Sequence, residues 1–167
     1  MVHISKALGE IGPQAGVVVN PALFVPDMAA VLAKCESPIE RDLAVALFGY
    51  IGLRRRTLNW ESRLRGTVDF AVEAQYEVST GVGDFRIDLL VAIQANGVRS
   101  SLAVECDGHD FHERTKAQAA HDKSRDRALA AAGCTVLRFT GSEIWRDATA
   151  CADEVQRVLA ERTGISF

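Results

Sequence analysis

Two acidic residues, Asp88 and Glu105, stand inside otherwise apolar stretches, FRIDLLV and LAVECD. An unpaired carboxylate is costly to bury, so two of them on neighbouring strands favour a shared cation. Mg²⁺ prefers such oxygen ligands, and Mn²⁺ would also suit them. Asp107 should point to the same face as Glu105, because side chains alternate along a strand. The sequence therefore predicts a metal site at Asp88 and Glu105, with Asp107 beside it.

Such a site could hydrolyse a phosphodiester, since a cation held by carboxylates can position a water molecule and neutralise the charge that builds on the phosphate. The reaction also needs groups that donate and accept protons. His112 and His109 follow Glu105 shortly in the chain and are candidates for a general acid or base. Taken alone, each histidine is explained more simply as a turn residue.

The acidic residues need strands and helices to hold them. The stretches VDFAVEAQYEV, FRIDLLVAIQ and SLAVECD are rich in strand-forming residues and predict three successive strands joined as a meander. A helix over about 113–132 should follow and end at Gly133, and a strand, CTVLRFT, should come next. A final helix over about 142–161 is expected, with Ser142 as its N-cap.

The run Ser37-Pro38-Ile39-Glu40 has the spacing of a capping box and predicts a helix over about 38–49. Leu43 and Leu47 recur at helical spacing after Ile39 and give this helix one buried face. The capping box explains Glu40 completely, and a role in the active site is the alternative. Residues 1–36 are predicted to form an irregular N-terminal arm, and residues 37–167 a single domain.

Composition narrows the class of protein. The chain has 167 residues, of which 48% are hydrophobic, enough for one domain with a sizeable core. It has no apolar run near the roughly 18 residues of a membrane span and no signal-peptide pattern, so a cytoplasmic protein is expected, without membrane contact. The four cysteines form no CxxC pair, which argues against a zinc knuckle.

The net charge of −3 argues against bulk electrostatic coating of nucleic acid, but it allows local basic patches. The segment RRRTLNWESRLR is the clear basic stretch of the chain. Its residues Arg54, Arg55 and Arg56, followed by Trp60, suit contacts with phosphates and bases. A solvated loop is the alternative interpretation.

Taken together, these residues resemble the PD-(D/E)XK (restriction-endonuclease-like) nuclease superfamily, and most of all its very-short-patch-repair-like branch and related bacterial domains. The resemblance covers about 37–140 and rests on one ordered series: Glu40, Asp88, Glu105, Asp107, Gly108, Asp122, Arg125, Leu129, Gly133, Val136, Leu137, Arg138 and Phe139. It implies an α/β (α+β) fold, with a mixed four-stranded sheet flanked by helices. It further implies metal at Asp88 and Glu105, with DNA as the usual substrate.

The resemblance also gives meaning to two further positions. Gln75, on the first predicted strand, matches a polar position often near the metal in this superfamily, although a solvated edge-strand glutamine is the more common case. Where the superfamily usually has a lysine, two residues after the Glu, this chain has Asp107. Lys123 and Lys116, which share one helical face, or a histidine such as His112, are candidates to replace that lysine.

Three functions remain open from the sequence. The first is a magnesium-dependent endonuclease that cuts DNA in repair, restriction or defence; a cut in both strands by so small a domain would favour a homodimer. The second is a catalytically inactive nucleic-acid-binding module of the same fold, which the missing lysine supports. The third is a ribonuclease, because nothing in the sequence shows whether a 2′-hydroxyl is recognised, and DNA and RNA therefore cannot be told apart as substrates.

The charged residues of the helix over about 113–132 are interpreted structurally. Asp122, Arg125 and Asp126 are expected to form salt bridges along their helix, and Arg138 is expected to pair with one of them.

Overall fold

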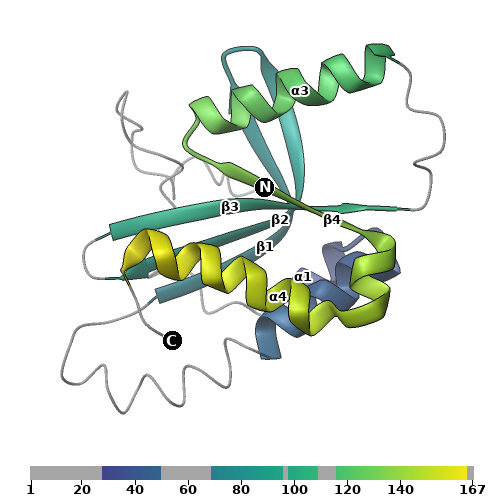
Figure 1. Cartoon of the computed structure of the whole chain (residues 1–167), viewed down its shortest axis with the longest axis vertical. Coiled ribbons are helices and arrows are strands. Elements are labelled where there is room, and N and C mark those ends of the chain that lie inside the picture. The colour runs from purple at the N-terminus through teal and green to yellow at the C-terminus, as the bar shows by residue number, and fades with distance from the viewer. Residues whose placement is uncertain (1–27, 50–68, 96–97, 109–115, 165–167) are drawn as a thin grey trace.

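The computed structural model describes residues 28–49, 69–95, 98–108 and 116–164 of the chain. They contain a four-stranded sheet in the order β1-β2-β3-β4, in which the first three strands form an antiparallel meander and β4 runs parallel to β3 (Figure 1). The strands are β1 (Asp69–Thr80), β2 (Gly83–Ala95), β3 (Val98–Asp107) and β4 (Thr135–Thr140). The predicted mixed four-stranded sheet is confirmed.

Helices cover both faces of this sheet. They are α1 (Met28–Lys34), a helix over residues 38–49, α3 (Lys116–Ala131) and α4 (Gly141–Thr163). In Figure 1, α3 lies on one side of the sheet, and α1 and α4 lie on the other. Among the described residues, no helix combines the length and the apolar character needed to cross a membrane.

Two of these helices differ from the sequence-based expectation. The helix α1 falls inside the N-terminal arm that was expected to be irregular, and it forms because Val31 buries its side chain against the sheet. Residues 1–27 of that arm lie outside the described residues. The N-cap of α4 is Thr140 and not Ser142, since the Thr140 hydroxyl accepts from the Glu143 amide and Glu143 reaches back to the Thr140 amide.

The face that carries α1, the 38–49 helix and α4 holds the larger hydrophobic core, here called the first core. Leu43 and Leu47 of the 38–49 helix are fully buried in it, as their helical spacing predicted. The other face holds the second core, in which Leu129 of α3 packs against the sheet. Asp88, Glu105 and Asp107 therefore lie on strands that helices hold from both sides.

Leu43→Ala should destabilise the protein by roughly 2–4 kcal/mol, because a fully buried leucine leaves a cavity that its neighbours only partly fill. The measurement is the free energy of unfolding in urea. Val45→Ala, on the same helix and 49% exposed, is the matched control and should change stability little. An unfolding curve for Leu43→Ala that overlays the parent's would contradict the assigned buried face.

The side chains of the β1–β2 hairpin change faces partway along the strands. Ala74 packs in the first core and Tyr76 in the second, although strict alternation would place both on one face. On β2 the same change separates Leu89, in the first core, from Ile87, in the second. Gln75 stands at the change with a φ of 54°, a value that residues other than glycine rarely adopt. The hairpin therefore rotates here, and its outer half packs against α3.

Candidate active site

Asp88 sits where the β2–β3 ladder ends. The last pair of residues in the ladder is Leu89 and Val104. Beyond this pair, the Asp88 carboxylate accepts the hydrogen bond from β3. Its Oδ2 accepts a hydrogen bond of 2.8 Å from the backbone N–H of Cys106. The acidic side chain thus replaces a backbone acceptor, which holds it at the point where the two strands part.

Glu105 lies across this opening on β3 and is 5% exposed. Both of its oxygens accept from Arg125 of α3: the Nη2–Oε1 distance is 2.6 Å and the Nη1–Oε2 distance is 3.0 Å. Arg125 also donates to the backbone oxygen of Arg86 on β2, at 2.6 Å. One guanidinium therefore links β3 to β2 beside the two predicted metal ligands.

The strand registers place four polar residues in one row across the sheet. Ala74 pairs with Leu89 and Tyr76 with Ile87, so Gln75 lies opposite Asp88. Continuing the β2–β3 register from its last pair sets Asp88 opposite Glu105, and Glu105 pairs with Arg138 on β4. The predicted neighbours Asp88 and Glu105 are brought together as expected.

Asp107 and Arg138 extend the site along β3 and β4. Arg138 Nη1 lies 3.9 Å from Asp107 Oδ1, and the same guanidinium pairs with Asp126 of α3. The expected pairing of Arg138 with an acidic residue of this helix is confirmed. Because Glu105 and Asp107 are two residues apart on one strand, both face α3 and its arginine.

Glu40 closes the opposite flank of the row. Its carboxylate accepts from the Ser37 hydroxyl at 2.7 Å, from the Glu36 amide at 2.8 Å and from Gln75 Nε2 at 2.9 Å. The Ser37 hydroxyl also accepts from the Glu40 amide at 3.3 Å, as the expected capping box requires, but the backbone amide that bonds the Glu40 side chain is that of Glu36 and not that of Ser37. The same side chain also ties its helix to the residue opposite Asp88. Among the described residues, the buried Gln75 Oε1 has no hydrogen-bond partner.

Burial makes this region costly for negative charge. It raises the pKa of Asp88 even though the Cys106 amide favours the ionised form. It also raises the pKa of Glu105 and outweighs the opposing effect of Arg125. The pKa of the Cys106 thiol is raised as well, first by burial and then by Asp88, Glu40 and Glu105. The site is therefore an acidic cluster whose charge Arg125 only partly offsets.

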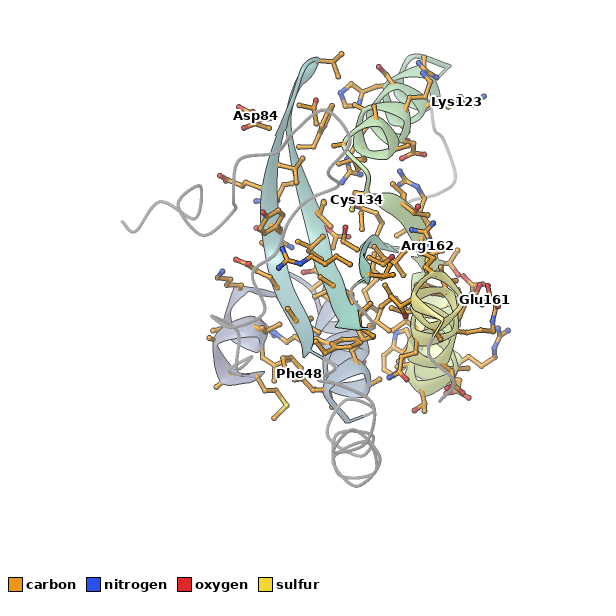
Figure 2. All side chains as sticks on the ribbon, turned by 90° about the vertical axis from the view of Figure 1, so that its left-hand side faces the viewer. Phe48, Asp84, Lys123, Cys134, Glu161 and Arg162 are labelled. Atoms are coloured by element: carbon orange, nitrogen blue, oxygen red, sulfur yellow. The ribbon has the colours of Figure 1, made fainter. Side chains whose placement is uncertain are left out.

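The structure separates the remaining candidates. Lys123 is exposed on α3 (Figure 2), and because it is two residues from Arg125 it points away from Glu105. His112, His109 and the segment Arg54–Arg56 lie outside the described residues.

Sequence reasoning assigned Arg125 to the helix surface and missed its place in the site. The available signal was its position one turn before Leu129, the α3 residue that is fully buried against the sheet. Residues on that turn face the sheet, and Arg125 is therefore the cation that α3 presents to Glu105.

A divalent cation fits the donor chemistry of the site under one condition. Within the described ranges, no three His, Cys, Asp or Glu residues are arranged to hold a metal ion. Mg²⁺, however, often binds one or two protein carboxylates and completes its shell with water and phosphate oxygens. Asp88, Glu105 and the unpartnered Gln75 Oε1 are oxygen donors of the right type. The condition is that Arg125, which bonds both oxygens of Glu105, gives up at least one.

The mixed four-stranded sheet, flanked by helices and carrying this acidic row, is consistent with a restriction-endonuclease-like core. Residues 64–159 match the family model REase_MTES_1575, and since this is more than half of the chain, the protein belongs to that restriction endonuclease-like family.

The other comparisons add little to the family assignment. A search of curated proteins finds no match to the chain. The crystal structure of AF1548, a protein of unknown function, resembles 70% of this chain at 19% identity and a TM-score of 0.34, and the match spans 54% of the AF1548 chain. The present chain therefore corresponds to about half of that protein.

Proposed function

We propose that this protein is a metal-dependent endonuclease that hydrolyses phosphodiester bonds in DNA. The observation that carries the proposal is the juxtaposition of Asp88 and Glu105 at the point where β2 parts from β3. Glu105 is buried and Asp88 is partly buried, and withdrawing both carboxylates from water costs free energy that a bound cation would offset. Membership of a restriction endonuclease-like family supports the same conclusion.

In this proposal Asp88 and Glu105 hold Mg²⁺ or Mn²⁺, and the ion supplies an activated water and charge neutralisation at the phosphate. Gln75 presents its free amide oxygen on the same row, and Glu40 fixes the Gln75 amide in place. Asp107 positions Arg138 on the α3 side of the sheet. His112 stays a candidate for proton transfer. The proposal also includes DNA as the substrate, a homodimer as the active form, and membership of the very-short-patch-repair-like branch.

A catalytically inactive nucleic-acid-binding module is the second candidate. The observation that favours it is the bidentate pair between Arg125 and Glu105, which satisfies one of the two acids without any metal. Asp88 argues against this alternative. Its carboxylate lies partly buried without an ion-pair partner among the described contacts, and a protein that only binds would gain nothing from retaining it.

The deciding experiment incubates the pure protein with supercoiled plasmid, single-stranded DNA and RNA, each with magnesium, manganese or a chelator. The proposal expects nicked or linear plasmid with either metal and intact plasmid with the chelator. Binding to DNA in a gel-shift assay without any cleavage would select the inactive module. Cleavage confined to RNA would change the substrate class and keep the metal chemistry.

Replacing Arg54, Arg55 and Arg56 together by alanine should weaken DNA binding at every sequence and flatten its salt dependence. Each lost phosphate contact removes about one released counterion, which lowers the slope of log K against log salt by roughly 0.9. The measurement is a fluorescence-anisotropy titration across several salt concentrations. The same slope in parent and variant would exclude this segment from the binding surface.

A further inference from the structure

The Glu105 carboxylate, which the proposed metal site needs as a ligand, is already bonded to Arg125. Its side chain is 6% exposed and that of Arg125 is 14% exposed, so the two charges meet largely away from water. The fork geometry, with two parallel N–H···O bonds, is the strongest that arginine and carboxylate can form. Glu105 therefore has a full positive partner before any metal binds.

Arg125 also spans the opening between the two strands. Its Nη2 bonds Glu105 on β3 and the backbone oxygen of Arg86 on β2, two residues before Asp88. The backbone ladder between these strands has ended at Leu89 and Val104. Beyond that pair, the contacts that join β2 to β3 include the Asp88–Cys106 bond and the bonds of Arg125 to Glu105 and to the Arg86 backbone oxygen. The guanidinium therefore occupies both Glu105 oxygens, at least one of which a cation bound by both acids would need.

Arg125 and a divalent cation would compete for Glu105, because both carry positive charge. Asp88 and Glu105 repel one another, and in the absence of a cation the Arg125 guanidinium offsets part of that repulsion. A divalent ion at the same carboxylates would instead repel the guanidinium. We propose that Arg125 is the built-in counter-ion of the metal-free site and exchanges with the divalent cation for Glu105. This inference rests on the proposed function and deepens it.

After the exchange, Arg125 would be free to contact the phosphate of the substrate. Once released from Glu105, its planar fork matches a phosphate oxygen pair, which a lysine cannot match in the same way. The chain has Asp107 where the superfamily usually has a lysine. Metal loading would thus supply, from α3, the positive group missing from β3. While it is bonded to Glu105, Arg125 controls when that carboxylate is free to bind the cation.

The test titrates Mg²⁺ into the full chain by calorimetry, with no nucleic acid present. Arg125→Ala should bind Mg²⁺ about tenfold more tightly than the parent, since releasing a charge-assisted bond of at least about 1.4 kcal/mol no longer opposes binding. Arg127→Ala, exposed on the same helix, is the matched control and should bind like the parent. If Arg125→Ala is too unstable to titrate, Arg125→Lys, which loses the fork, should show a smaller tightening in the same direction.

A second readout needs no metal. Arg125→Ala should lower the melting temperature of the parent more than that of Glu105→Gln, because only the parent is left with an unpaired buried carboxylate. Equal losses in the two backgrounds, or unchanged or weaker Mg²⁺ binding by the arginine variants, would overturn the exchange and leave the nuclease proposal standing. If neither the parent nor any arginine variant binds Mg²⁺, both the exchange and the metal-dependent function fail together.

Discussion

Asp88→Asn and Glu105→Gln should each reduce magnesium-dependent cleavage to below about 1% of the parental rate. Both changes preserve shape and remove the charge that would hold the cation, and loss of one preorganised electrostatic group already costs roughly 10²–10³ in turnover. The measurement is the rate of plasmid nicking at saturating magnesium, together with Mg²⁺ affinity by calorimetry. Loss of cleavage with loss of metal binding, and with DNA binding intact, is the expected combination.

Matched controls come from exposed acids on the same hairpin. Asp84→Asn, near the hairpin tip in Figure 2, and Glu77→Gln make the same chemical changes outside the row and should leave cleavage unchanged. Parental rates in both Asp88→Asn and Glu105→Gln would end the nuclease interpretation of these two residues.

Stability against pH gives an independent check on Asp88. A carboxyl whose pKa is raised by folding contributes stability below its ordinary pKa of about 3.9, and that contribution is lost as pH rises through the folded pKa. Asn cannot ionise and can still accept from the Cys106 amide. Without metal, Asp88→Asn should therefore exceed the parent in melting temperature most at pH 8, and the advantage should shrink as pH falls toward 4. A constant difference would show that partial burial does not raise the pKa of Asp88.

Glu40→Ala should destabilise the protein by roughly 2–4 kcal/mol, since three hydrogen bonds to a buried carboxylate disappear and the Gln75 amide loses its acceptor. Cleavage should fall further than the loss of folded protein explains, because Gln75 lies opposite Asp88. The measurements are urea unfolding and the cleavage rate under fully folded conditions.

Two companion variants sharpen this second prediction. Glu40→Gln should be milder than Glu40→Ala, because its new amide can donate to the Gln75 Oε1 that now lacks a partner. Asp42→Ala, exposed on the same helix, should stay within about 0.5 kcal/mol of the parent. Full activity in Glu40→Ala at parental stability would remove Glu40 from the site and from the support of its helix.

Much of the fold follows from local pattern. The three strand-forming stretches pair as the predicted meander, and Gly133 ends α3 with a φ of 79°, as expected for a C-terminal glycine. The expected helix over 38–49 is present, and its apolar spacing chose the buried face correctly. What local pattern missed was α1, whose stability comes from contact with the sheet and not from its own periodicity.

The candidate site was only half predictable, for a physical reason. Asp88 and Glu105 stand out because a charge in an apolar strand is costly wherever the strand goes. Arg125 does not stand out, because arginine is ordinary in a charged helix and its meaning depends on how α3 lies over β3. Gln75 adopts its φ of 54° only because the two strands rotate there together, which alternation of residue types does not encode.

That rotation has a consequence for how the molecule opens and closes. Gln75 and Asp88 stand where the hairpin changes faces: its inner half contributes side chains to both cores, and the buried side chains of its outer half belong to the second core. The second core is the smaller of the two and includes α3, which makes it the natural first unit to open in a local unfolding event. Such an opening would withdraw Arg125 and dissolve the acidic row while the first core stayed intact. The acidic row and Arg125 are therefore expected to come together only while both cores are folded, so that loss of either core would abolish the site.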